Sequence, residues 1–273
     1  MQNKSNLPYL VKLIDDDNVT VREEVIKSLT DYGINLEEDL IEFTDFLDDD
    51  KLDIINPILQ QNRKEWLIRE WPNWQLKLDD YDQIECALNS IAKYQYGLTH
   101  VDDLAQLLDS LAEEFTLDYP YGNEIDLSNF LFHFKEFKGD KENYYNPLNS
   151  NLIYVMKNKK GLPITLSCVY MLVAHRLSLK VEGCNFPGHF LVRTFLDDEK
   201  IFIDCYNNGK ILYESDFESL TEESYESIIH ILNLYVSPKT IIQRVLNNLI
   251  NAYKNKGDNE NSTFFNDLLK NYF

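Results

Sequence analysis

The sequence predicts an α+β protein in which one buried helix packs against an antiparallel sheet, with helical regions before and after this core. Three observations support that fold class. The segment "PITLSCVYMLVAHRL", which begins at Pro163, is apolar nearly all round, as expected of a helix inside a core. Four short apolar runs with strand character follow it: "KVEGCNF", "HFLVRTF", "KIFIDCY" and "GKILY". Before residue 138 and after residue 237, apolar residues recur at helical spacing instead.

The first 72 residues are expected to form a helical N-terminal region. Residues 6–31 hold two short segments with helical apolar spacing, separated by "DDDN", and this pattern resembles one HEAT-type helix pair. A solenoid needs about three such units to bury a shared core, and the sequence has no clear second copy. We therefore expect residues 1–72 to form a HEAT-like region that packs onto the rest of the protein and ends at a hinge near Pro72.

The predicted core region spans residues 79–236. Residues 79–117 carry two apolar stripes at helical spacing, and "SNFLFHFKEF" is apolar enough for a buried helix that Ser128 would cap. A polar, turn-rich passage from Lys138 then leads to Pro163, whose ring fits the first turn of a helix. Beyond this core, residues 237–273 contain two amphipathic segments around "NKGDN", the spacing of one tetratricopeptide-like helix pair.

Charge and hydropathy exclude several classes of function. The 273-residue chain has 46 acidic and 26 basic residues, a net charge of −20 that repels nucleic acid and anionic lipid. Neither a signal-type apolar run nor a stretch of about 18 apolar residues occurs, so we expect a soluble, cytoplasmic protein that does not contact membranes. Four scattered cysteines without a C-x-x-C pair predict free thiols, no zinc site, and no metal or cofactor.

One histidine stands where a catalytic base could be presented. His189 lies between a Pro-Gly turn and the apolar run "FLVRTF", and Asp204 closes the next apolar run. Because one hairpin separates them, we expect His189 and Asp204 to be hydrogen-bonded at adjacent strand ends. Gly188 should then have a backbone conformation that residues with a Cβ rarely adopt. The order helix, histidine, aspartate is the one in which papain-like folds activate a cysteine.

The block from residue 129 to residue 212 resembles a known family. The stretches "YYNPLNS", "GLPITLS", "GCNFPGHFLVR" and "FIDCYNNG" together are similar to the bacterial SirB-type branch of the transglutaminase-like superfamily, whose members carry a C-terminal tetratricopeptide-like region. The resemblance covers about residues 80–270 and leaves the HEAT-like N-terminus outside. It implies a transglutaminase-like, papain-like core and, in the catalytic members, a nucleophilic cysteine at the start of the buried helix.

The nucleophile position departs from the family pattern. Catalytic members of the wider superfamily place cysteine in a G-x-C pattern, and the matching residues here are Gly161, Leu162 and Pro163. Cys168 lies five residues further into the apolar helix, where a thiol usually behaves as an inert small hydrophobe. The loop after the last catalytic position also differs, with "DCYNNG" where the family typically has "DPFNGG".

Two functions from different classes stay open. In the first, which we favour because proline replaces the nucleophile, the Cys/His/Asp site is degenerate and the chain binds a protein or peptide. In the second, the chain is a cysteine hydrolase or acyl-transfer enzyme: Cys168 attacks an amide, His189 is the base and Asp204 orients it. His189 and Asp204 could equally form a structural pair, and "NYYNPLNS" a self-bonded turn. The candidate cleft or binding residues are Pro163, Thr165, Ser167, Asn143, Tyr145, Asn149, Gly188 and Asn207.

Overall fold

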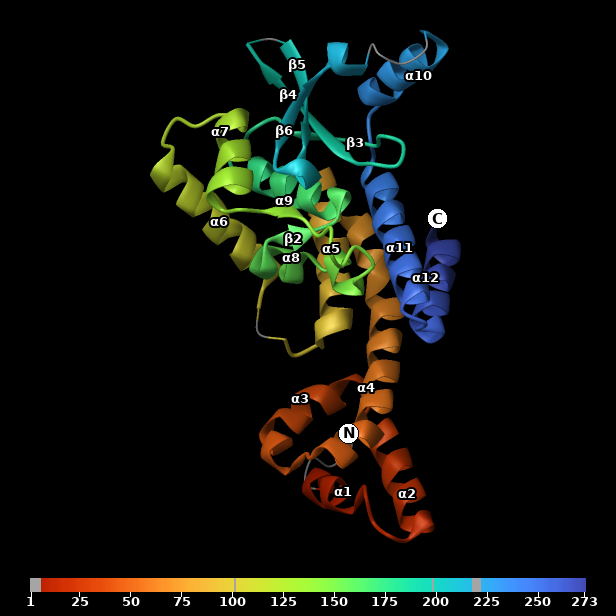
Figure 1. Cartoon of the computed structure of the whole chain (residues 1–273). Helices are drawn as coiled ribbons and strands as arrows, with labels where there is room; N and C mark the ends of the chain where they lie inside the picture. The colour runs from red at the N-terminus through yellow and green to blue at the C-terminus, as the bar shows by residue number, and fades with distance from the viewer. Residues whose placement is uncertain (1–5, 101, 198, 218–221) are drawn as a thin grey trace. The chain divides into compact units, whose positions relative to one another are not determined.

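The computed structural model describes residues 6–100, 102–197, 199–217 and 222–273. Helices and one four-stranded antiparallel sheet make up the α+β fold that the sequence predicts (Figure 1). The chain divides into two compact units, one within Met1–Pro72 and Lys93–Val101, the other within Asn73–Ala92 and Asp102–Phe273. Among the helices of the described ranges, none has the length and apolar character required to cross a bilayer.

The first unit is built from short helices around a small apolar core. Its elements are α1 (Leu7–Leu13), α2 (Val19–Thr30), η2 (Gly33–Asn35), α3 (Leu36–Leu40), η3 (Ile41–Phe46) and α4 (Asp49–Glu70). Asn18, in the "DDDN" break, caps α2 by accepting the Thr20 backbone N–H. Asp48 caps α4 in the same way through Lys51. Leucine, isoleucine and valine side chains from α1, α2, α3 and α4 form the core of this unit.

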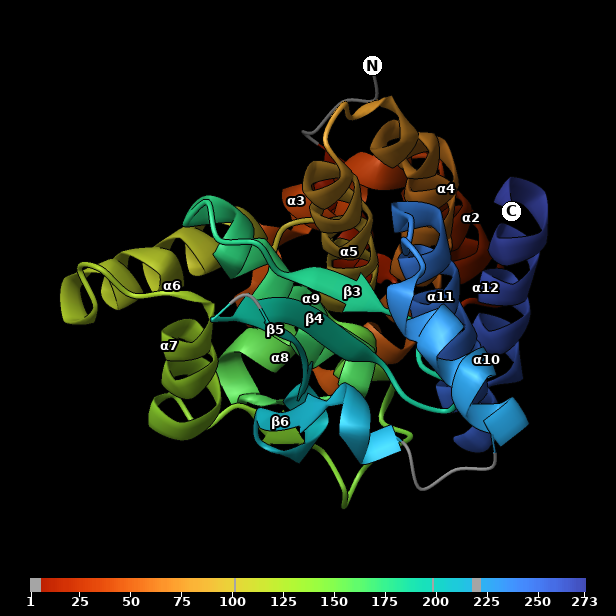
Figure 2. The same ribbon diagram turned by 90° about the horizontal axis from the view of Figure 1, so that it is seen from above.

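The second unit contains the later helices. They are α5 (Asp80–Tyr96, which ends in the first unit), α6 (Leu104–Asp118), α7 (Glu124–Asn129), α8 (Leu152–Asn158), α9 (Pro163–Arg176), α10 (Glu222–Asn233), α11 (Pro238–Asn255) and α12 (Asn259–Tyr272). Shorter helical turns are η4 (Trp71–Leu76), η5 (Phe130–Phe134), η6 (Pro147–Ser150), η7 (Cys205–Asn207) and η8 (Glu214–Phe217). Helices α11 and α12 lie side by side in both ribbon views (Figures 1 and 2).

The sheet and helix α9 form the centre of the second unit. The strand order is β3 (Glu182–Cys184), β4 (Leu191–Leu196), β5 (Glu199–Asp204) and β6 (Lys210–Tyr213), with each neighbouring pair antiparallel. Twelve successive residues of α9, from Pro163 to Ala174, are buried. The apolar pattern predicts this for the residues from Leu166 onward, but not for the polar side chains of the first turns. The ribbon views place α9 along one face of the sheet (Figures 1 and 2). On the other face, Leu191 and Phe202 pack with Leu232 of α10.

A very short parallel pair of strands positions the polar passage that precedes α9. Strand β1 (Lys138–Gly139) pairs with β2 (Lys160–Gly161), so the loop between them starts and ends beside the first turn of α9. The loop itself contains η6 and α8, two elements that the sequence patterns do not predict.

The predicted cap of the helix before this loop was wrong. Asn123, and not Ser128, caps α7: the Asn123 side chain accepts the backbone N–H of Asp126, whose carboxylate accepts the Asn123 N–H. Ser128 lies inside α7, because the helix begins at Glu124, four residues before Ser128.

Candidate functional site

His189 and Asp204 form the centre of the candidate site. Asp204 is the last residue of β5, and His189 lies two residues before β4. The pairing of Val192 with Ile203 places these two strand ends next to each other. The distance from His189 Nε2 to Asp204 Oδ1 is 2.8 Å, so the predicted hydrogen bond is confirmed. The side chains are 23% and 10% exposed, so solvent reaches the imidazole more readily than the carboxylate.

The Asp204 carboxylate is held by its own loop. Its Oδ1 accepts the backbone N–H groups of Tyr206 and Asn207, each at 3.1 Å, and its Oδ2 accepts the Asn207 side-chain amide at 2.8 Å. Burial raises the pKa of Asp204, but hydrogen bonds from His189 and Asn207 outweigh burial and lower it overall. An ionised carboxylate only accepts hydrogen bonds, so His189 Nε2 is the donor in this bond.

Gly188 gives the turn before His189 its shape. Its φ is +71°, in the left-handed region that residues with a Cβ rarely adopt, so this prediction is confirmed. The backbone N–H of His189 donates to the Phe186 carbonyl at 3.1 Å, which closes the turn. An added Cβ at Gly188 would meet no heavy atom within 4 Å among the described residues, so backbone strain alone opposes a larger residue there.

A series of aromatic rings continues from His189 over the surface. The Tyr206 ring centroid lies 6.0 Å from that of His189 and 6.3 Å from that of Tyr144, both nearly perpendicular. Tyr144 in turn contacts Tyr145 edge-on, at 5.2 Å. Gly139 permits this packing, because a Cβ there would lie 2.4 Å from the Tyr206 ring. Tyr206 was not among the predicted site residues, although it lies in the "DCYNNG" stretch that carries the resemblance.

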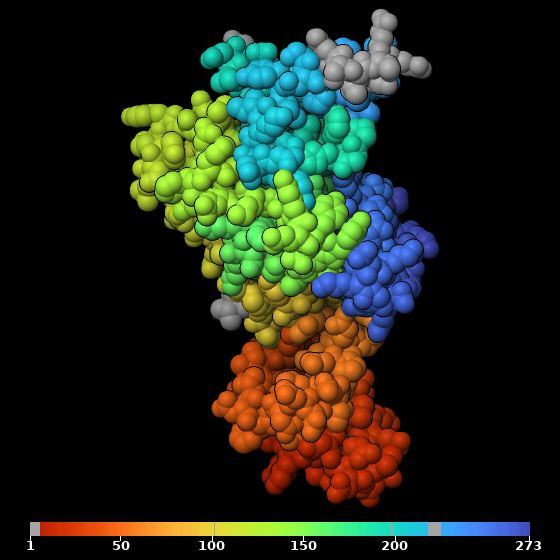
Figure 3. Space-filling model, viewed as in Figure 1, coloured from red at the N-terminus to blue at the C-terminus, as the bar shows by residue number. Residues whose placement is uncertain are grey.

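Beside these rings, the surface has a hollow of about 500 Å³. It is lined by residues 141–146, by Asn255 at the end of α11 and by Lys256, the residue after it. Figure 3 shows the green surface of the loop next to the blue surface of α11. Two of the predicted binding residues, Asn143 and Tyr145, line this hollow.

Four other predicted cleft residues do not reach the surface. Pro163, Thr165, Ser167 and Asn149 are buried, so the prediction that they line a cleft is corrected. The reason is that the loop before α9 and the sheet cover the first turns of that helix. Asn143, Tyr145, Gly188 and Asn207 are exposed, although the Asn207 amide is engaged by Asp204.

The buried residues hold the loop against α9. The Thr165 hydroxyl donates to the Asn149 carbonyl at 2.9 Å and accepts the Leu162 N–H at 2.9 Å. The Asn149 amide donates to the Asp140 carboxylate at 3.2 Å and to the Asn143 carbonyl at 2.8 Å. These side chains therefore position the loop that carries Tyr144 and Tyr145.

Cys168 is surrounded by protein on every side. Its exposed fraction is 0%, and burial raises the pKa of its thiol to about 12. Burial also raises the pKa of Cys184, to about 11, and that of Cys205. The four cysteines are free thiols, as the sequence predicts. At neutral pH the three buried thiols are protonated.

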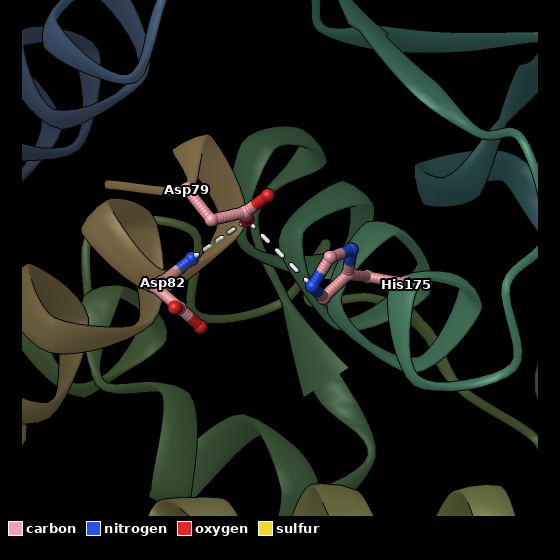
Figure 4. A group of neighbouring side chains, drawn as sticks. All are labelled: Asp79, Asp82 and His175. Atoms are coloured by element: carbon pink, nitrogen blue, oxygen red, sulfur yellow. Dashed lines mark hydrogen bonds and ion pairs between the residues drawn. The ribbon is translucent and has the colours of Figure 1, made fainter. Parts of the chain in front are cut away.

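A separate group of possible metal ligands lies near the start of α5. One side-chain atom each from Asp79, Asp82 and His175 lies within 4.8 Å of the others (Figure 4). Asp79 Oδ1 accepts the backbone N–H groups of Tyr81 and Asp82, at 2.8 and 3.3 Å, and lies 3.6 Å from His175 Nε2. The capping of α5 accounts for the position of Asp79. This group shares no residue with the site around His189.

Comparison with known proteins decides the family. A family model described as the transglutaminase-like superfamily matches residues 99–247, which is more than half of the chain. The chain belongs to the transglutaminase-like superfamily. The match includes the buried helix, the sheet and both members of the His189–Asp204 pair.

Relatives of this superfamily protein occur in bacteria and in animals. A UPF0162 protein of Xylella fastidiosa is 34% identical over 167 residues, which cover 58% of this chain and 57% of that protein. F-box only protein 21 of Mus musculus is 30% identical over 157 residues, which cover 54% of this chain and 25% of that protein. The chain thus spans about half the length of the bacterial relatives it matches. No solved structure shows a significant match.

Proposed function

We propose that this chain is a protein- or peptide-binding module of the transglutaminase-like superfamily with a degenerate Cys/His/Asp site. The observation that carries the proposal is the state of the thiol. Cys168 is fully buried and its pKa is about 12. The resemblance matches Pro163, the first residue of α9, with the cysteine of catalytic superfamily members. Nucleophilic catalysis requires a thiolate that the substrate can reach.

The surface beside His189 suits the side chains of a peptide. His189, Tyr206, Tyr144 and Tyr145 offer ring faces and edges, and aromatic residues are enriched where proteins bind other chains. The hollow of about 500 Å³ has the size range of small binding pockets. The ligand in this proposal is neither nucleic acid nor membrane, because the net charge of −20 repels both.

One observation favours a second candidate, a cysteine hydrolase or acyl-transfer enzyme. The His189–Asp204 hydrogen bond of 2.8 Å is the arrangement that orients a catalytic imidazole. In that enzyme Cys168 would be the nucleophile, so the helix α9 and its covering loop would have to move to admit both substrate and base. The binding function needs no such movement.

Three finer assignments accompany the proposal. We place the chain in the SirB-type branch, on the basis of the stretches "GCNFPGHFLVR" and "FIDCYNNG", and in the cytoplasm. We interpret α11 and α12 as a tetratricopeptide-like pair and residues 1–72 as a HEAT-like region. In this interpretation the helical regions assist partner binding and take no part in chemistry.

A soluble synthetic library of random octapeptides with free C-termini tests the proposal. The protein is mixed with the library, bound peptides are separated by gel filtration, and they are sequenced by mass spectrometry. We expect recovered peptides whose binding is lost in His189→Ala and in Tyr145→Ala. The matched control is Tyr9→Ala, which removes a tyrosine that is 69% exposed in the first unit. Peptides that bind wild type and both site variants equally would contradict the proposed site.

A further inference from the structure

Arg244 of α11 reaches the turn that carries His189. Its Nη1 donates to the Asn185 side-chain oxygen and, at 3.2 Å, to the Phe186 carbonyl. The same Phe186 carbonyl accepts the backbone N–H of His189 at 3.1 Å. The guanidinium carbon lies 5.6 Å from the centroid of the Phe190 ring. Arg244 and the backbone N–H of His189 therefore donate to the same carbonyl, which places the positive charge of Arg244 close to the candidate site.

This positive charge has no acidic partner among the described residues. The half-buried Arg244 donates only to neutral oxygens. Burial lowers the pKa of Arg244, while Tyr144 and Cys184 raise it, and no carboxylate contributes. Three other arginines with poorly exposed side chains are each paired with a carboxylate: Arg63, Arg176 and Arg193. Arg22, in the first unit, is the other described arginine without an ion pair, and it donates to the Asp16 backbone carbonyl at 2.6 Å.

The guanidinium also keeps unused hydrogen-bond donors. It has five N–H groups, and both of its acceptors contact Nη1. In the part of the chain that is described, Nε and Nη2 have no acceptor. An Nε and Nη2 pair presents the two parallel donors that match a carboxylate.

Two lysines add positive charge to the hollow beside the aromatic rings. Tyr144, whose side chain acts on the pKa of Arg244, lines the hollow together with Lys141 and Lys256. Neither Lys141 nor Lys256 makes an ion pair with any described residue. Glu142, the acidic residue of the hollow, is instead paired with Lys160, at 3.7 Å. Because the Debye length is about 8 Å at physiological salt, the net charge of distant parts of the chain acts only weakly on a ligand that contacts Arg244.

We propose that the ligand of this site carries a carboxylate and that Arg244 binds it, so that the module recognises an acidic peptide. This inference rests on the proposed binding function and adds its chemical class. The carboxylate can belong to an Asp or Glu side chain or to the C-terminus of the peptide. His189 and the tyrosines would then contact the residues next to that carboxylate.

Chemical changes in the peptide test the inference without altering the protein. Each recovered octapeptide is resynthesised with Asp and Glu replaced by Asn and Gln, and separately with an amidated C-terminus. Titration calorimetry should show that one of these forms binds roughly 10-fold or more weakly, the loss expected for one charge-assisted contact. The form that loses affinity identifies the source of the carboxylate. Equal affinity of all forms would overturn the inference and leave the proposed function standing.

Variants of the protein provide the matching half of the test. In Arg244→Gln, the neutralised and the original peptide should bind within about 2-fold of each other, because the contact that distinguishes them is gone. Lys270→Gln removes an exposed charge of α12. This control should bind the original peptide more tightly than the neutralised one by the same factor as the wild type. Thermal unfolding of each variant identifies any loss of folding. If a folded Arg244→Gln protein still distinguished the original from the neutralised peptide as strongly as the wild type, the role of Arg244 would be overturned.

A small probe separates this inference from the proposed function. N-acetylglutamate is titrated against protein labelled with ¹⁵N, and the Arg244 Nε–H resonance is followed, with N-acetylglutamine amide as the neutral control. We expect a shift with the glutamate probe alone. If that shift occurs but the library yields no peptide, the carboxylate site stands and the peptide-binding function fails. If neither probe nor library binds, both fail.

Discussion

The Asp204 carboxylate, which belongs to the candidate site, also contributes to the stability of the fold. Its pKa is lowered in the folded protein, because hydrogen bonds from His189 and Asn207 favour the charged form more strongly than burial disfavours it. A carboxyl group with a lowered pKa stabilises the fold above its unfolded pKa of about 3.9, and this contribution is lost as the pH falls through the folded pKa.

We therefore predict a pH-dependent difference between wild type and Asp204→Asn. The wild type should have the higher free energy of unfolding at about pH 6, and the difference should shrink below about pH 4, where Asp204 of the unfolded chain begins to take up a proton before Asp204 of the folded protein does. Urea unfolding of both proteins at a series of pH values measures this. Asp126→Asn, in the cap of α7, serves as the comparison for removing a carboxylate elsewhere. A difference that is constant with pH would contradict the role given to Asp204.

Gly188 allows a prediction about the turn. Gly188→Ala should lower the free energy of unfolding by about 1–2 kcal/mol, since a Cβ is strained at φ +71° although space is available. Gly188→Asn should cost less, because asparagine tolerates this region better. Denaturant midpoints of the two variants test the order. A Gly188→Ala protein as stable as wild type would show that the turn does not need its left-handed residue.

At the scale of elements, the start of α9 depends on one hydroxyl. Thr165→Val keeps the size of the side chain but leaves the Leu162 N–H and the Asn149 carbonyl buried without the hydroxyl. We expect a loss of about 1–3 kcal/mol in the free energy of unfolding. Thr116→Val is the matched control: this hydroxyl donates to Ala112 in its own helix, and its loss should cost under about 0.5 kcal/mol. Equal losses in the two variants, measured by urea unfolding, would contradict this role of Thr165.

The fold class could be predicted because the strongest patterns belong to the core. A helix that is apolar all round has to be buried, and the strands β4 and β5 follow each other with one hairpin between them, which also places His189 beside Asp204. Helix α8 was missed because its seven residues are too short to show a helical period within a polar passage. The cap of α7 was misplaced because the helix starts at Glu124, ahead of the continuous apolar run that begins at Phe130.

The candidate site could be predicted only where its residues are close in sequence. The burial of Asn149, Thr165 and Ser167 could not be predicted, since a polar side chain is buried only when distant partners satisfy it. Arg244 lies on α11, far along the chain from the Asn185 turn that it contacts, and helical spacing gives no sign of this contact. The burial of Cys168 could be predicted, because it lies inside a helix that is apolar nearly all round.

At the scale of the whole molecule, the excess of acidic residues allows a prediction about stability. The net charge of −20 makes the folded chain repel itself, and salt screens such repulsion. We predict that the melting temperature rises between about 0.01 and 0.15 M sodium chloride, by roughly 2–4 °C for each kcal/mol gained. Calorimetry at a series of salt concentrations measures this. A melting temperature that falls with salt would mean that attractive ion pairs such as Arg63–Glu37 outweigh the repulsion.

The absence of an accessible nucleophile is the central claim, and thiol labelling tests it most directly. Native protein is treated with iodoacetamide near pH 8, and each cysteine is followed by peptide mass spectrometry. With a pKa of about 12, only roughly one Cys168 thiol in 10,000 is ionised at pH 8. The Cys168 side chain is also fully buried. We predict that half-buried Cys86 reacts first, that Cys168 reacts only as the protein unfolds in urea, and that His189→Ala changes neither rate. Rapid labelling of Cys168 in the native protein, abolished by His189→Ala, would contradict the claim and establish an activated cysteine.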